Sequence, residues 1–385
     1  MNILVIGGYD TKNLGDYASF LGLQNILGDS YNFTVLSRHV DDSFSQEFNV
    51  SCIKNLDHET KNKSIGRMFN GFNSGDDNQH LINIYNEMIR SDAVLFGNGR
   101  LFVDISLDFM TGPLSYFSII VILAKFMNKP IILYSVSLVH PKTENGKKHL
   151  KMILDNSNAV IVREISSAET ASKYMSDSRK ISILPDIAFS LPVIGSQESI
   201  DFLLPDEFIV VNFRGLDFTS ELSIKKIKDN ANKVISLIER YQTKVIFISQ
   251  CNYNVDNDLT DDRETNRKVY IEMPSKYQSQ CLLVEDELSL KETLTIYKNA
   301  THTFTYRRHG FILALTQQTT ASLICNEDNT KFVKDSISDP RFYLDDKSEF
   351  IIPTIDRVEL ARELTVMKVK CNQYKSIIEN ICNKS

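Results

Sequence analysis

The first sixteen residues, MNILVIGGYDTKNLGD (Met1–Asp16), decide the fold of this chain. The short apolar run Asn2–Ile6 predicts a strand, the glycine pair after it predicts a sharp turn, and a helical pattern continues from Asp16 to Leu27. A strand, a glycine turn and a helix in this order open a Rossmann-like unit. The N-terminus lacks the basic region and the small-residue cleavage site of a signal peptide, so we expect a first strand rather than a leader.

The alternation of strands and helices continues through two series, which predicts parallel sheets. A segment rich in proline and polar residues, Ser190–Pro205, separates the series. We therefore expect an N-terminal Rossmann-like domain at 1–190, a C-terminal one at 206–350, and one long helix at 354–385 that packs back on the domains, since its apolar residues recur every three or four positions. The predicted strands are Asn2–Ile6, Asn32–Leu36, Ala93–Phe96, Pro130–Val136, Ala159–Val162 and Ile181–Leu184, then Phe208–Phe213, Lys244–Ser249, Leu282–Val284, Thr303–Tyr306 and Ser322–Cys325.

Composition excludes several classes of protein. The chain has 385 residues and a formal net charge of −6, without a basic run, so we expect no nucleic-acid partner. Six widely spaced cysteines without a C-x-x-C pair indicate free thiols rather than a zinc site. The most apolar stretch, Tyr116–Met127, is shorter than a membrane span and contains Lys125, so it predicts a buried helix and at most peripheral membrane contact. The polar stretch Lys54–His80 predicts a functional or disordered loop.

Two glycine-rich segments follow predicted strands, at the strand ends where open α/β sheets bind ligands. In Gly7–Asp16, the turn and the helix start can approach a ligand, but Asn13 and Asp16 can equally shape the turn and cap the helix. The segment is not the G-x-G-x-x-G fingerprint of a dinucleotide site. In FGNGRLFVD (Phe96–Asp104), Asp104 can present its carboxylate to a sugar hydroxyl or can cap a helix.

The sharpest motif is YRRHGFILAL (Tyr306–Leu315), where a strand ends and an apolar helix begins. Arg307, Arg308 and His309 bring two guanidiniums and an imidazole to one helix N-terminus, a combination that suits a phosphate or a carboxylate. His309 can also donate a proton near neutral pH. The alternative is a histidine hydrogen-bonded inside a helix start, beside two solvated arginines.

Four further residues can be functional or purely structural. Arg163, in VREISS, can pair with a carboxylate and stabilise the fold, and Asp186, in LPDIAF, lies at a strand end near the domain junction. Arg214 ends the first strand of the second domain, and Lys331 comes soon after a later strand of that domain. Each of these two cations can reach a cleft or remain on the surface.

In this order, the segments resemble the polysaccharide pyruvyl transferase family. The resemblance extends to Lys331, and the usual run of glycines is interrupted here by Asn98 and Arg100. The matching residues are Asn13, Gly15 and Asp16; Gly97, Gly99 and Asp104; Arg163, Glu164 and Ser167; Pro185, Asp186 and Phe189; and Arg308, His309, Gly310 and Lys331.

The resemblance implies a fold similar to the glycosyltransferase-B arrangement, with two Rossmann-like domains facing a cleft. It also implies transfer of a pyruvyl group from phosphoenolpyruvate to two hydroxyls of a sugar, which forms a cyclic ketal and releases phosphate, without a metal or organic cofactor. The product would belong to an exopolysaccharide, a capsule or the cell wall. We expect an enzyme of the cytoplasm, or of the inner face of the membrane, whose acceptor is free or lipid-linked. A homo-oligomer remains open.

The donor's charges lead to a hypothesis for the site. Arg308 and Lys331, with Arg214, bind the anion, His309 is the general acid, and Asp104 or Asp16 is a base or orients the acceptor hydroxyl. Further predicted substrate contacts are Arg307, Gly310, Asn13, Gly97, Asn98, Gly99 and Asp186. Two other functions stay open, a glycosyltransferase that uses a nucleotide sugar and a non-catalytic protein that binds an acidic glycan.

Overall fold

The computed structural model describes residues 1–9, 12–37, 42–55, 78–104, 113–195, 200, 202–216, 218, 220–252, 261–325 and 331–383. Most of the predicted loop 54–80 and of the acidic segment 252–264 lies outside these residues, as does part of the segment 190–205. The chain divides into two compact units. The first comprises Met1–Asp10, Ser19–Ile187 and Lys370–Ser385, and the second comprises Thr11–Ala18 and Ala188–Val369.

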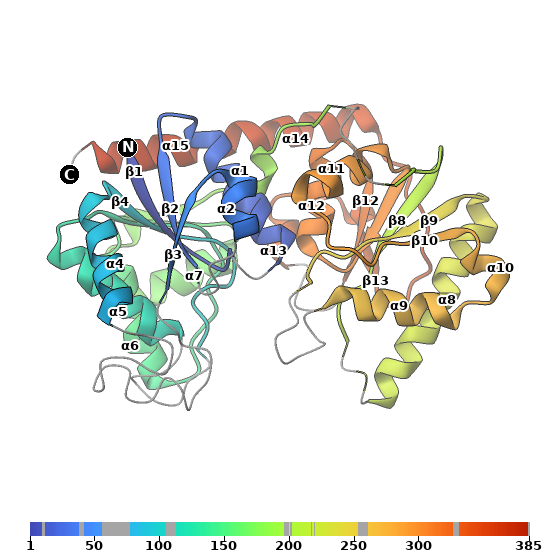
Figure 1. Cartoon of the computed structure of the whole chain (residues 1–385), viewed down its shortest axis with the longest axis horizontal. Helices are drawn as coiled ribbons and strands as arrows, with labels where there is room; N and C mark the ends of the chain where they lie inside the picture. Colours follow the sequence, from blue (N-terminus) through green and yellow to red (C-terminus); the bar gives the residue numbers. More distant parts are fainter. Residues whose placement is uncertain are drawn as a thin grey trace. The chain divides into compact units, whose positions relative to one another are not determined.

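The described residues of the first unit form seven parallel strands. They are β1 (Asn2–Ile6), β2 (Asn32–Ser37), β3 (Ser51–Lys54), β4 (Ala93–Phe96), β5 (Ile131–Val136), β6 (Ala159–Val162) and β7 (Ile181–Ile183), in the sheet order β3-β2-β1-β4-β5-β6-β7. Figure 1 labels β1, β2, β3 and β4 of this sheet. The helices of this unit are α2 (Asp42–Phe48), α4 (Asn78–Arg90), α5 (Pro113–Phe126), α6 (Glu144–Asn156), α7 (Ile165–Tyr174) and α15 (Gln373–Cys382). A short 3-10 turn lies at Ser178–Lys180, and another, at Ile187–Ser190, begins in this unit. The helix α1 (Leu14–Leu27) contributes its first residues to the second unit and the rest to the first.

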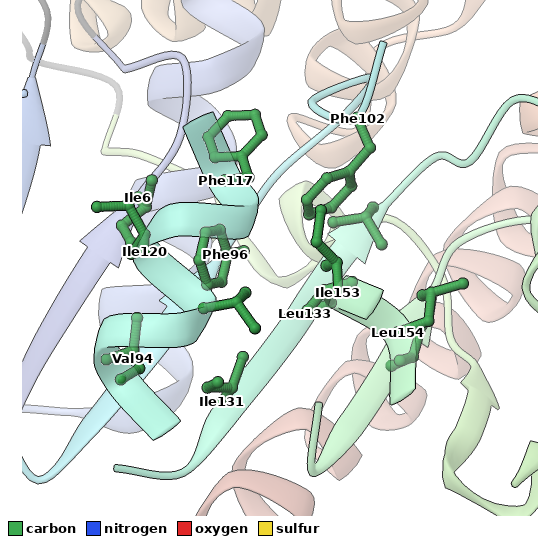
Figure 2. Close-up of a cluster of buried hydrophobic side chains, with 14 of the residues drawn as sticks. Ile6, Val94, Phe96, Phe102, Phe117, Ile120, Ile131, Leu133, Ile153 and Leu154 are labelled. Atoms are coloured by element: carbon green, nitrogen blue, oxygen red, sulfur yellow. The ribbon is translucent and has the colours of Figure 1, made fainter. Parts of the chain in front are cut away.

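The core of the first unit forms where α5 and α6 cover the sheet. Figure 2 shows Phe117 and Ile120 of α5 beside Phe96 of β4, with Ile153 of α6 beside Leu133 of β5. All five side chains are almost fully buried. The predicted buried helix is therefore confirmed as α5, and within the described residues no helix combines the length and the apolar character that a membrane span needs.

The second unit repeats the plan, with six parallel strands in the part that the structure describes. They are β8 (Phe208–Asn212), β9 (Lys244–Phe247), β10 (Cys281–Leu283), β11 (His302–Thr305), β12 (Ala321–Cys325) and β13 (Tyr343–Asp345), in the order β10-β9-β8-β11-β12-β13. Its helices are α8 (Glu221–Tyr241), α9 (Asp262–Glu272), α10 (Ser275–Gln278), α11 (Leu290–Asn299), α12 (Arg308–Thr316), α13 (Lys331–Lys334) and most of α14 (Arg357–Cys371), with a 3-10 turn at Pro340–Phe342. Phe304 stacks on Phe350 in its core, with ring centroids 4.7 Å apart.

These two sheets confirm the predicted α/β class, with two Rossmann-like units and a long C-terminal helical region. That region is two helices, α14 and α15, which meet at Asn372. The helix α8 begins at Glu221, because Ser220 caps it by accepting a hydrogen bond from the backbone N–H of Ser223. None of the six cysteines forms a disulfide.

In both sheets the strand order reverses direction at one place. The reversal lies between β1 and β4 in the first unit and between β8 and β11 in the second. Open parallel sheets bind ligands outside the carboxyl ends of their strands at such a point. The segments that begin at Gly7, Gly97, Phe213 and Tyr306 directly follow these four strands, so the fold favours ligand binding by them.

Candidate functional site

The first turns of α1 and α12 meet in the second unit. Gly15 and His309 are each the second residue of their helix, and the imidazole lies so close to Gly15 that a Cβ atom there would be 2.0 Å from Nδ1. Only glycine is compatible with this approach. Because the N–H groups of a first helical turn have no partner within their helix, two partly positive helix starts lie side by side here. The structure thus joins the Gly7–Asp16 segment to the arginine–histidine motif.

The start of α1 is fixed to the segment that follows β9. The Leu14 N–H donates to the carbonyl of Gln250 at 3.0 Å, and Asn13 forms a bridge with Cys251. The Asn13 side-chain oxygen accepts from the N–H of Gly15 at 3.0 Å, so α1 begins at Leu14 and not at Asp16 as predicted. Asp16 lies in the first turn and is half-buried.

Arg307 precedes α12 and pairs with Asp262, the first residue of α9. The distance between Arg307 Nη2 and Asp262 Oδ1 is 2.5 Å, and the carboxylate is fully buried. Burial alone would lower the pKa of Arg307, but the attraction of Asp262 outweighs burial and raises this pKa above its ordinary value. Asp262 also accepts hydrogen bonds from the backbone N–H groups of Gly215 and Gln250, at 3.0 and 3.1 Å. The pair therefore joins the segments after β8, β9 and β11, which favours a positioning role for Arg307.

The other predicted cations of this unit lie at or near the same sheet edge. Arg308 is the first residue of α12 and is half-buried, and Lys331 begins α13 after β12. Gly310 is buried, and a Cβ atom there would lie 2.7 Å from Thr305 Oγ1, so α12 starts close against β11. Arg214 is exposed and lines a cavity of about 260 Å³ with Lys226, Asn230 and Tyr306, among others.

In the first unit, the segment Gly97–Gly99 packs tightly between the ends of β1 and β5. A Cβ atom at Gly7 would lie 2.0 Å from the Gly97 carbonyl oxygen, and one at Gly97 would lie 2.2 Å from the Tyr134 ring. The Gly97–Asn98 peptide is cis, and Gly99 has a φ of 67°. The predicted contact residues Gly97, Asn98 and Gly99 are all buried, and Asn98 is only 3% exposed.

Asp104 holds the start of α6. Its carboxylate accepts from the backbone N–H and from the hydroxyl of Thr143, at 2.7 and 3.0 Å, while Thr143 caps α6. A Cβ atom at Gly146 would lie 2.4 Å from Asp104 Oδ2. This geometry favours the capping alternative for Asp104, although the helix is α6 rather than the next one in the chain.

Asp186 is also engaged within the first unit. Its Oδ2 atom lies 2.5 Å from Nη1 of Arg163, and both side chains are buried. Arg163 also donates from Nε to the Ser137 hydroxyl at 2.8 Å, and the Tyr374 hydroxyl of α15 donates to the neighbouring Pro185 carbonyl at 3.0 Å. Arg163 therefore forms the buried ion pair with a carboxylate that its structural alternative predicts, and the carboxylate is that of Asp186.

Sequence reasoning missed Asp262. It lies at the end of an acidic segment, and nothing in its neighbours marks it as the partner of Arg307. Sequence reasoning also missed Asn212 at the end of β8. The side chain of Asn212 accepts a hydrogen bond from the Thr305 hydroxyl at 2.9 Å, which joins the ends of β8 and β11. Within the described residues, no group of three or more His, Cys, Asp or Glu side chains is arranged to hold a metal ion.

Three comparisons relate this chain to known proteins. The family model described as polysaccharide pyruvyl transferase matches residues 13–322. A search of curated proteins finds no match. Similar solved structures include the UDP-GlcNAc 2-epimerase from Methanocaldococcus jannaschii, at 12% identity and a TM-score of 0.61, with 99% of this chain and 100% of that chain covered.

The UDP-N-acetylglucosamine 2-epimerase from Rickettsia bellii has 10% identity and a TM-score of 0.57, with 100% of this chain and 97% of that chain covered. The apo structure of OtsA has 8% identity and a TM-score of 0.54, with 99% of each chain covered. At these identities the likeness shows the fold alone.

Proposed function

This chain belongs to the polysaccharide pyruvyl transferase family and is a transferase, and we propose that it moves a pyruvyl group from phosphoenolpyruvate to two hydroxyls of a sugar. The product is a cyclic ketal in a cell-surface polysaccharide or its precursor, and phosphate is released. The single observation that carries this proposal is the contact of His309 with Gly15, where the first turns of α1 and α12 meet.

The donor explains why helix starts and cations are needed. Phosphoenolpyruvate carries a phosphate and a carboxylate, and each helix N-terminus acts as roughly half a positive charge. We assign its binding to the first turn of α12 with Arg308, Arg214 and Lys331, because the Leu14 and Gly15 N–H groups of α1 already donate to Gln250 and Asn13. Arg307 supports them by holding the start of α12 to Asp262.

The proposed reaction starts at the methylene carbon of the donor. Protonated His309 gives this carbon a proton, and the adjacent carbon becomes an oxocarbenium-like centre that the first sugar hydroxyl attacks. The C–O bond to phosphate then breaks, and the second hydroxyl closes the ketal. Of the two hydroxyl protons, one regenerates protonated His309 and the other leaves with phosphate. We assign the base to Asp16, because it directly follows Gly15 in the first turn of α1.

The test combines ligand binding with turnover. We expect phosphoenolpyruvate to raise the melting temperature of the wild-type protein, since a ligand at 100 times its Kd stabilises by about 2.7 kcal/mol. His309→Ala should keep this shift and lose phosphate release in the presence of methyl hexopyranosides, and Arg308→Ala should lose the shift. Release by His309→Ala at the wild-type rate would show that the acid is another group.

The same assay decides the nucleotide-sugar alternative. One similar structure, the epimerase from Neisseria meningitidis at 11% identity, is bound to UDP-GlcNAc. If UDP stabilises this protein and phosphoenolpyruvate does not, the chain is a glycosyltransferase of the same architecture. We also propose that turnover needs no metal or organic cofactor, so EDTA should leave it unchanged, and that the enzyme works in the cytoplasm.

A further inference from the structure

The side chain of Asn98 is the unusual polar group of the first unit. It follows β4, at the point where the strand order reverses, and it is 3% exposed. Neither its Oδ1 nor its Nδ2 atom has a hydrogen-bond partner among the described residues. A buried amide left without partners destabilises a fold, and such groups in native proteins call for a specific explanation.

The backbone around Asn98 has its partners within the unit. Gly97 donates to the Ile6 carbonyl at 3.0 Å, and Gly99 donates to the Ser135 carbonyl at 3.1 Å while its own carbonyl accepts from Ser137 at 2.8 Å. The nearby hydroxyls of Tyr9 and Tyr134 are hydrogen-bonded to each other. These backbone hydrogen bonds hold the loop in place. The Asn98 carboxamide takes no part in them, so it remains a fixed donor and acceptor.

We infer that Asn98 is a specificity-determining contact for a pair of neighbouring hydroxyls on the acceptor sugar, which rests on the proposed function. An amide offers one acceptor oxygen and two N–H donors, and a hydroxyl can both donate and accept. Two hydroxyls on nearby carbons can therefore engage both ends of the amide at once. An anion would satisfy the N–H groups alone and would face the amide oxygen, so the donor's charges are a poor match.

The position of Asn98 within a glycine run also supports this contact. Asn98 interrupts the glycine run of the segment Gly97–Gly99, where a Cβ atom at Gly97 would meet the Tyr134 ring and the φ of 67° at Gly99 would strain any other residue. A side chain is accommodated at position 98 alone within these three residues. Specificity built on paired polar groups is strong, because an acceptor that lacks one hydroxyl leaves buried groups unmatched.

The experiment compares two buried asparagines of the first unit. Asn55 is also 3% exposed, but its Oδ1 atom accepts a hydrogen bond from the Tyr116 hydroxyl. Asn98→Leu removes polar atoms that have no protein partner, so we expect an unchanged or higher melting temperature. Asn55→Leu removes a partnered amide and should lower the melting temperature by several degrees.

The functional arm measures phosphate release with phosphoenolpyruvate and methyl hexopyranosides. Asn98→Leu should reduce kcat/KM for the glycoside by about 10- to 100-fold, mainly through KM, and should keep the thermal shift with phosphoenolpyruvate. Binding of the same glycosides, and of AMP, is measured by calorimetry. Glycoside binding that is lost in Asn98→Leu supports the inference even if no phosphate is released, and in that case the transfer reaction alone is wrong.

Three outcomes overturn the inference. Unchanged glycoside binding and kcat/KM in Asn98→Leu would show that the amide does not contact the acceptor. A melting temperature that falls as far as in Asn55→Leu would show that a buried water or the protein itself satisfies the amide. Binding of AMP, and not of glycosides, through Asn98 would assign the amide to a nucleobase.

Discussion

Replacing Gly15 by alanine tests the contact on which the proposed site depends. The new Cβ atom would lie 2.0 Å from Nδ1 of His309 and 2.5 Å from Cγ of the same ring, whereas an ordinary contact needs at least 3.4 Å. The imidazole must therefore move by more than 1 Å. It cannot retreat with its helix, because Gly310 already lies against Thr305. We expect a destabilisation of about 1–3 kcal/mol, as for other overpacked sites, and a loss of about 100-fold in kcat from the misplaced acid.

The control for this prediction is the same change made without the ring. A His309→Ala background removes the ring atoms that lie nearest to a Cβ atom at Gly15, and alanine favours a helix over glycine by up to about 1 kcal/mol. Gly15→Ala should therefore be neutral or stabilising there, and a double-mutant cycle by urea unfolding should give a coupling free energy of at least about 1 kcal/mol. If Gly15→Ala costs the same in both backgrounds, the two helix starts do not meet as described.

Three other measurements test the buried polar groups. Arg163→Met should cost about 3–5 kcal/mol in urea unfolding because it leaves Asp186 buried without its cation, and adding Asp186→Leu should recover part of this loss. Asp262→Asn should weaken the anchoring of Arg307, with a cost of about 3 kcal/mol and a smaller thermal shift with phosphoenolpyruvate; an unchanged shift would separate Arg307 from the donor site. Burial lowers the pKa of His302 to about 3, against about 6.5 in the unfolded chain, so its contribution to stability is present above pH 6.5 and is lost as the pH falls toward 3. At pH 5 this loss is about 2 kcal/mol, and His302→Gln should flatten the pH dependence between 6.5 and 4; an equal slope in both proteins would contradict the assignment.

The sequence predicted the fold well because the spacing of apolar residues and the glycine turns between elements determine each strand and helix locally. The run Asn2–Ile6, the glycine turn and the helix after it all lie within thirty residues, and each later unit repeats this local pattern. A cap shifted one helix boundary, since Asn13 starts α1 at Leu14 and not at the predicted Asp16. The long C-terminal helix was predicted from its apolar spacing, but its division at Asn372 was not.

Contacts between distant segments could not be predicted in the same way. Gly15 and His309 each belong to a recognisable motif, yet their contact depends on how two helices begin on the sheet of the second unit. Asp262 had no signal at all, since its role arises from the strand order that brings Gly215, Gln250 and Arg307 together. These relations are tertiary, and a pattern along the chain does not contain them.

The polar residues discussed above are of two kinds, which differ in whether the protein itself binds the side chain. Protein groups engage the first kind: Arg163 pairs with Asp186, Arg307 pairs with Asp262, and Asp104 accepts hydrogen bonds from Thr143 at the start of α6. Changing these residues should therefore lower stability first, with activity falling as a consequence. Asn98 has no such match among the described residues, so its loss should reduce substrate recognition without a cost in stability. Measuring unfolding free energy and kcat/KM together for each motif residue would distinguish the two kinds, because activity tracks stability only in the first.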